Sequence, residues 1–109
     1  MSDTIAITVR PFRMGTDKEA ALKPLEEAAE AFGAWQELNS TLAMSSHLGE
    51  AYTAKTLTGS WVDAASHDLA DELADTITAC ANLAARYGID LQAAIDRVEL
   101  RNRERGRYE

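Results

Sequence analysis

The chain has 109 residues, 46% hydrophobic and only 6% aromatic, a composition that favours packed helices over strands. Its formal net charge of −7 argues against duplex nucleic acid as a partner, because contact with phosphate backbones needs a basic surface. We therefore expect a single domain over residues 1–109, built mainly from helices.

Residues 1–15 are predicted to form an N-terminal arm ahead of the first helix. From Thr4 to Val9 the chain is rich in β-branched residues and partly alternating, and Pro11 closes the stretch. The pattern predicts either a short edge strand, paired with something like a second copy of the chain, or an extended arm. The start of the sequence has no basic leader and no long apolar run, so we expect a cytoplasmic protein without membrane contact.

The first helix is predicted to end near Leu38. Asp17 is a suitable N-cap, but Pro24 removes a backbone donor, so the main helix either starts near Pro24 or is kinked there. From Leu25 to Leu38 apolar residues recur at helical spacing. Another side of this helix carries glutamates: Glu26, Glu27, Glu30 and Glu37.

Residues 39–59 have weak periodicity and many Ser, Thr and Gly residues, which predicts a variable connecting segment with "STLAMSSHL" as a short helix. The next helix begins between 60 and 67 and runs to Tyr87. Cys80, the single cysteine, is expected to act there as a small hydrophobic side chain. Apolar residues at spacings of three and four are predicted to face the core: Leu69, Leu73, Ile77, Cys80 and Ala84.

The last helix follows a turn at Gly88, a natural C′ residue, and begins after Asp90, a natural N-cap. Apolar residues from Leu91 to Val98 share one side, and the tail beyond them is rich in arginine. These elements predict an all-α helical bundle of three main helices plus a short one, completed by oligomerisation, with a short N-terminal strand or arm.

Acidic side chains form a row on each of the two long predicted helices. Asp68, Glu72 and Asp75 stand at i, i+4 and i+7, so their carboxylates line one side of a helix. Glu27 and Glu30 are one turn apart on the earlier helix. Both rows adjoin the apolar stripe of their helix, so packing the helices would bring about four to six carboxylates toward one cleft.

Such a cluster is tolerable mainly when a hard cation neutralises it. Carboxylate oxygens and water suit Mg²⁺ or Mn²⁺, whereas a single cysteine and the scattered His47 and His67 suit zinc poorly. The alternative is that the acidic rows are solvated faces of an acidic protein. The position of the rows beside the apolar stripes favours the cation site.

Two short acidic motifs occur in order along the chain, "EEAAE" at Glu26–Glu30 and "DELAD" at Asp71–Asp75. They resemble the E-x-x-E and E-x-x-D signature of the MazG-like, all-α nucleoside triphosphate pyrophosphohydrolases. The resemblance extends into "NLAARYGIDLQAAIDRVELRNRERGRY" and covers roughly residues 24–40 and 67–108. It implies cleavage of a nucleoside triphosphate to the monophosphate and pyrophosphate by a homodimer or homotetramer. It also implies that Mg²⁺ is held by Glu27, Glu30, Glu72 and Asp75.

The other site residues follow in part from chemistry and in part from this resemblance. Glu27 and Glu30 are both candidates for a general base, which needs a carboxylate with a free oxygen. By the resemblance, Asn102 and Arg103 contact the phosphates, which suit guanidinium forks. Asn82 extends the acidic row and offers an amide to the base or sugar. Aromatic side chains offer a stacking surface for the base: Trp35, Trp61 and Tyr52.

Two alternative functions stay open. A non-catalytic helical interaction module would bind a partner helix through the apolar stripes and would need no metal. A nucleotide-binding protein of the same fold would sequester or sense its ligand without releasing pyrophosphate. We favour the enzyme because all four expected ligands are acidic and none is replaced by an apolar residue.

Overall fold

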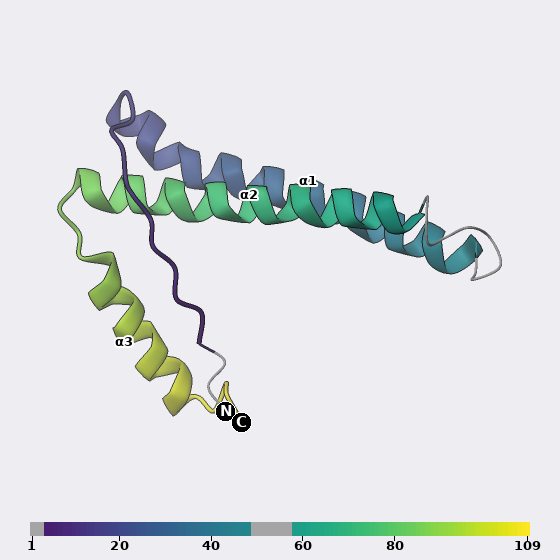
Figure 1. Ribbon diagram of the computed structural model, residues 1–109. Coiled ribbons are helices and arrows are strands. Elements are labelled where there is room, and N and C mark those ends of the chain that lie inside the picture. Colours follow the sequence, from purple (N-terminus) through teal and green to yellow (C-terminus); the bar gives the residue numbers. More distant parts are fainter. Residues whose placement is uncertain (1–3, 49–57) are drawn as a thin grey trace.

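The protein is all-α. The computed structural model describes residues 4–48 and 58–109, and the side chains of residues 4–44 and 60–109. Its three helices are α1 (Asp17–Leu48), α2 (Thr58–Arg86) and α3 (Leu91–Glu104), and the described residues contain no strand (Figure 1). The predicted fold class is confirmed. None of these described helices combines the length and apolar character that a membrane crossing needs.

α1 begins at Asp17 and runs through Pro24. Thr16, not Asp17, caps it: Oγ1 of Thr16 accepts a hydrogen bond from the Glu19 backbone N–H at 3.1 Å. Asp17 instead adds negative charge to the first turn, where the helix dipole favours it, and pairs with Arg86 Nε at 2.6 Å. A start near Pro24 is therefore wrong, because these contacts hold the turns that precede it.

α1 also continues past Leu38 to Leu48, so the short helix predicted in this region is the end of α1. Thr41 does not break it: its Oγ1 donates to the Glu37 carbonyl at 2.8 Å, and the residue is 8% exposed. Tertiary burial thus outweighs weak helix propensity. The rest of the predicted connecting segment lies largely in residues 49–57, outside the described residues.

α1 and α2 form an antiparallel hairpin (Figure 1). Buried and half-buried positions recur on both helices at spacings of three and four. On α1 these contact positions are Ala20, Pro24, Glu27, Ala31, Ala34, Leu38 and Thr41. On α2 they are Val62, Ala65, Leu69, Glu72, Thr76, Ala79, Leu83 and Arg86. The buried hydrophobic side chains among the described residues are all alanines, so the helices approach closely but bury little apolar area within one chain.

The predicted core stripe of α2 is rotated away from the observed contact positions. Leu73 is 49% exposed, Ile77 is 38% exposed and Cys80 is exposed, whereas Leu69 is half-buried and Ala84 is buried. The prediction is therefore wrong for the outer part of this stripe. The reason is that smaller or polar residues one position earlier make the contact with α1.

The hairpin has an acidic face and an apolar face. Successive residues of an α-helix are about 100° apart, so the two neighbours of each contact position point to opposite sides of an antiparallel hairpin. Residues just before contact positions form the acidic face: Lys23, Glu26, Glu30, Glu37, Asp68, Asp71, Asp75 and Asn82. Residues just after them form the apolar face: Leu25, Phe32, Trp35, Leu42, Leu73, Ile77 and Cys80.

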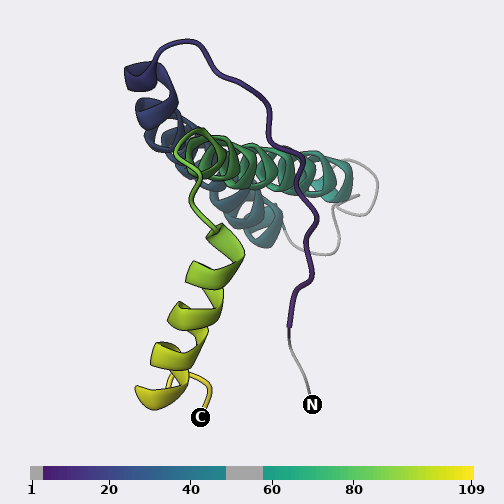
Figure 2. The same cartoon turned by 90° about the vertical axis from the view of Figure 1, so that its left-hand side faces the viewer.

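A tight turn joins α2 to α3, as predicted. Gly88 has φ of +64°, and the Ile89 N–H donates to the Ala84 carbonyl at 2.9 Å, the pattern of a Schellman ending. Asp90 caps α3, because its Oδ1 accepts from the Ala93 N–H at 3.0 Å. α3 then points away from the hairpin and has no buried residue (Figure 2).

Residues 4–15 form a non-helical arm that crosses α2 (Figures 1 and 2). Of the two predicted forms, the arm is the one observed. Ile5 and Ile7 are exposed, at 80% and 57%. They border an apolar groove of about 850 Å³ that lies between the arm, α2 and the start of α3.

Candidate metal centre

A cluster of carboxylates from both helices of the hairpin lies at their contact. Glu27 of α1 and Glu72 and Asp75 of α2 each offer one oxygen, and these oxygens lie within 4.8 Å of one another. Glu27 is 8% exposed, Glu72 is half-buried and Asp75 is exposed. The cluster therefore opens to solvent on the acidic face, on the Asp75 side.

Two oxygens of this cluster are buried without a hydrogen-bond partner: Oε2 of Glu27 and Oε2 of Glu72. A buried carboxylate oxygen that accepts nothing costs free energy, and a second carboxylate beside it adds repulsion. Hard divalent cations prefer oxygen ligands of this kind. The donor set, all carboxylates and no sulfur or imidazole, fits Mg²⁺ or Mn²⁺ better than zinc.

Glu30 belongs to the same group of carboxylates. It stands one turn after Glu27 and lies on the acidic face. Repulsion by the Glu27 carboxylate, with hydrogen bonds from its protonated form to Glu27 and Glu72, raises the pKa of Glu30 above its ordinary value of 4.5. Three of the four residues expected to be metal ligands, Glu27, Glu72 and Asp75, thus share one group of close oxygens, and Glu30 interacts with Glu27 and Glu72 beside it.

Lys23 is the residue at this centre that the sequence pattern did not single out. Its Nζ lies 3.3 Å from Oε1 of Glu27 and 3.7 Å from Oε2 of Glu26. The hydrogen bond to Glu27 and the attraction of that carboxylate raise the pKa of Lys23. The sequence does contain Lys23 and Glu27 as an i, i+4 pair of opposite charges. Such pairs are common on helix surfaces, so this one does not by itself indicate a functional site.

The remaining acidic residues of the predicted rows stay outside the cluster. Asp68, Asp71 and Glu37 are exposed and belong to no group of close carboxylates among the described residues. Fewer carboxylates therefore come together than the largest number expected from the sequence. The cluster consists of Glu27, Glu72 and Asp75, with Glu30 beside it.

The residues predicted to bind phosphate in the arginine-rich tail lie on α3. Asn102 is half-buried there, and Arg103 pairs with Glu99 at 2.6 Å through Nη2. α3 does not pack extensively on α1 or α2, so one chain does not bring these residues to the carboxylates (Figure 1). Their role in substrate binding stays a prediction.

The aromatic residues predicted to stack on a base lie elsewhere. Trp35 is 46% exposed on the apolar face and stacks on Phe32, with ring centroids 5.5 Å apart. Trp61 is 47% exposed near the start of α2, and Tyr52 lies outside the described residues. Within one chain, Trp35 is turned to the side opposite the acidic face, so a base contact by it stays a prediction.

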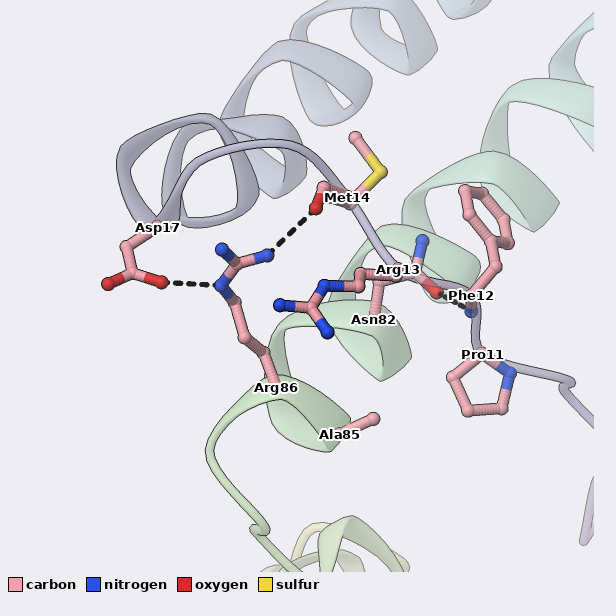
Figure 3. A pocket seen from close by; sticks show the side chains of 8 residues that line it. All are labelled: Pro11, Phe12, Arg13, Met14, Asp17, Asn82, Ala85 and Arg86. Atoms are coloured by element: carbon pink, nitrogen blue, oxygen red, sulfur yellow. Dashed lines mark hydrogen bonds and ion pairs between the residues drawn. The ribbon is translucent and has the colours of Figure 1, made fainter.

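Asn82 connects α2 to the N-terminal arm. It is 4% exposed, and its Oδ1 accepts a hydrogen bond from the Phe12 N–H at 2.8 Å (Figure 3). Four residues further on, Arg86 donates to the Met14 carbonyl at 2.9 Å and the Gly15 carbonyl at 2.8 Å. The amide oxygen of Asn82 thus holds the arm against α2. The sequence did not predict this contact.

A comparison of the chain with known protein families, with characterised proteins and with solved structures finds no significant match.

Proposed function

We propose that the protein is a Mg²⁺-dependent nucleoside triphosphate pyrophosphohydrolase, which cleaves (d)NTP to (d)NMP and pyrophosphate. The observation that carries the proposal is the meeting of Glu27, Glu72 and Asp75 at one point of the hairpin, with Glu30 beside Glu27 and Glu72. These are the positions at which the two acidic motifs resemble those of the MazG-like family. The buried, unpartnered oxygens of Glu27 and Glu72 support a cation at the same point.

The four carboxylates would hold the metal through their oxygens. When bound, Mg²⁺ supplies charge neutralisation for the phosphates and polarises a water molecule. Without a cation the cluster repels a triphosphate, because its nearest groups carry the same sign of charge. The acidic face therefore suits a polyphosphate substrate only in the presence of a divalent metal.

Glu30 is the better placed of the two candidates for the general base. Oε1 of Glu27 is paired with Lys23, and its Oε2 is buried away from solvent, so neither oxygen is open to a water molecule. Glu30 is exposed on the acidic face, where a water molecule reaches it. Its raised pKa makes its carboxylate a better proton acceptor than an ordinary glutamate.

Lys23 would contact a phosphate of the bound substrate. Its ammonium group lies at the edge of the cluster, 3.3 Å from Glu27, and is partly exposed. A lysine in such a position binds phosphate as a point charge. Its partners Glu26 and Glu27 hold it toward the centre while no substrate is bound.

The apolar face favours self-association as part of the same proposal. Phe32, Trp35 and Leu73 remain about half exposed on it, and such a surface is unusual on a monomer. We propose that this face packs on the same face of a second copy to make a larger bundle. The acidic face then stays open to the nucleotide, in the cytoplasm where such substrates occur.

The test is pyrophosphate release from a panel of ribo- and deoxyribonucleoside triphosphates, with Mg²⁺ and with EDTA. Glu72→Gln keeps the shape of the side chain and removes its charge, so it is expected to lower the rate by a factor of about 100 or more. Asp71→Asn is the matched control, because it removes one charge from the adjacent exposed position. It is expected to keep the wild-type rate.

Release that needs Mg²⁺ and is lost only in Glu72→Gln supports the enzyme. Nucleotide binding that needs Mg²⁺, without release from any triphosphate, would replace the enzyme by a nucleotide-binding protein. If the folded chain neither binds a nucleotide nor releases pyrophosphate, both the enzyme and the nucleotide-binding protein are overturned, and the interaction module is favoured.

A further inference from the structure

A second polar site lies at the end of the hairpin where α1 begins and α2 ends, beside the arm. The groove has a volume of about 490 Å³ (Figure 3). Its walls come from the arm, the start of α1 and the last turns of α2. The lining residues are Pro11, Phe12, Arg13, Met14, Asp17, Asn82, Ala85 and Arg86.

Four hydrogen-bond acceptors around this groove already accept from groups of the chain. The Met14 and Gly15 carbonyls and the Asp17 carboxylate all accept from Arg86, at 2.6 to 2.9 Å. Oδ1 of Asn82 accepts from the Phe12 N–H. These contacts tie the arm to α2, and each of the four acceptors already has one donor from the chain.

Donors, in contrast, remain free. The Arg13 guanidinium lines the groove and has no hydrogen-bond or ion-pair partner in the part of the chain that the structure describes. Nδ2 of Asn82 also has no partner among the described residues; the residue is 4% exposed, and Nδ2 is not one of its buried atoms but keeps contact with solvent. The backbone of the arm fixes the oxygen of this amide, so its N–H₂ is an oriented donor for a ligand in the groove.

The charge of the groove also favours an anionic ligand. Arg13 and Arg86 face one carboxylate, that of Asp17, so the three side chains leave one positive charge. The whole chain carries a formal charge of −7, and this site therefore runs against the general trend. A guanidinium fork and an amide N–H₂ together match the oxygens of a phosphate group.

We propose that this groove binds a phosphate group through Arg13, Nδ2 of Asn82 and the remaining N–H groups of Arg86. The site uses none of the carboxylates of the metal centre, so it does not rest on the hydrolase activity. Asp75 and Asn82 lie on the same face of α2, seven residues apart, which is about 10 Å along the helix. The phosphate therefore belongs either to the nucleotide held at the metal centre or to a separate phosphate-bearing ligand.

The experiment is calorimetric titration of the full chain with inorganic pyrophosphate in EDTA, where the acidic cluster repels the probe. Wild type is expected to show saturable binding. Arg13→Ala is expected to weaken binding by about tenfold or more, the loss of one charge-assisted contact. Arg10→Ala removes the same charge from an exposed arm position that does not line the groove, and it is expected to bind as wild type.

Asn82→Asp separates the ligand contact from the arm contact. A carboxylate oxygen at this position still accepts from the Phe12 N–H, but the N–H₂ donor is replaced by a second acceptor with negative charge. This variant is expected to keep the helix content seen by circular dichroism and to lose pyrophosphate binding. No saturable binding by wild type, or equal binding by wild type, Arg13→Ala and Asn82→Asp, overturns the proposal.

The source of the phosphate is decided with Mg²⁺ and a nucleoside triphosphate. If Arg13→Ala weakens the nucleotide by the same factor as pyrophosphate, the groove holds part of the nucleotide. If the nucleotide binds Arg13→Ala as tightly as wild type, the groove serves a separate phosphate ligand. Either result is consistent with a phosphate site in the groove and identifies only the molecule that carries the phosphate.

Discussion

Glu72 carries a half-buried carboxylate whose Oε2 has no partner, next to Glu27 and Asp75. Without a divalent cation this arrangement is repulsive, so Glu72→Gln is expected to stabilise the metal-free chain. A gain of about 1 kcal/mol corresponds to a rise in Tm of about 4–8 °C for a domain of this size. The measurement is thermal unfolding in EDTA, followed by circular dichroism.

Addition of Mg²⁺ is expected to reverse the order. It raises the Tm of wild type and leaves that of Glu72→Gln nearly unchanged, because only the intact set of carboxylates binds the ion. Asp71→Asn serves as the control and is expected to respond to Mg²⁺ as wild type does. A lower Tm for Glu72→Gln in EDTA would show that the carboxylate stabilises the metal-free fold.

Glu30 gives the centre a pH dependence. Its pKa in the folded chain is raised above 4.5 by Glu27, so the folded state holds this proton more tightly than the unfolded chain does. The contribution of Glu30 to metal-free stability is therefore full below about pH 4.5 and is lost as the pH rises through the raised pKa. The Tm gain from Mg²⁺ is expected to grow over the same interval, since the ion replaces the proton.

Thermal unfolding at a series of pH values, with and without Mg²⁺, checks this expectation. Glu30→Gln has no proton to exchange at this position, and its response to Mg²⁺ is expected to be small and to vary less between pH 4 and 7. A Mg²⁺ effect in wild type that is equal at all these pH values would contradict the assigned coupling of Glu30 to the metal.

At the scale of the elements, two glycines differ in what they do for the helices. Gly88 ends α2 with φ of +64°, where an added Cβ is strained, so Gly88→Ala is expected to cost about 1–2 kcal/mol. Gly33 lies inside α1 with nothing within 4 Å of an added Cβ, so Gly33→Ala is expected to gain about 0.5–1 kcal/mol. Urea unfolding of the two variants measures both signs, and equal effects would contradict this assignment.

Local chemistry explains which elements could be predicted. Gly88 and Asp90 mark the turn before α3 because one takes a left-handed backbone and the other accepts from a helix N–H. The end of α1 was missed because Thr41 has weak helix propensity alone and is fixed by burial. The α2 contact positions were missed because the prediction followed the large hydrophobic residues of the helix. The contact with α1 is instead made by small and polar residues such as Thr76 and Ala79.

The same distinction holds for the candidate site. Glu27, Glu72 and Asp75 meet, with Glu30 beside them, because all four lie at or next to contact positions of their helices, and helical periodicity predicts this from the sequence. The contacts of Asn82 and Arg86 with the arm join residues about 70 positions apart, and no local pattern encodes them. Arg13 therefore had no predicted role.

At the scale of the whole molecule, the apolar face determines the state of the chain in solution. Phe32 is 57% exposed at the middle of this face, and Phe32→Glu is expected to convert an oligomer into monomers by placing a charge in the contact. Ser40→Glu adds the same charge at an exposed position just before contact position Thr41, on the side of the acidic face, and it is expected to leave the oligomer intact. Sedimentation velocity of the three proteins distinguishes them, and a monomeric wild type would contradict self-association.

The most direct test of the central claim is calorimetric titration of Mn²⁺ into wild type, Glu72→Gln and Asp71→Asn at neutral pH. Saturable binding is expected for wild type and for Asp71→Asn, with a loss of affinity of about tenfold or more in Glu72→Gln. Equal, weak binding to all three proteins would show that the carboxylates of the hairpin are only a solvated acidic surface.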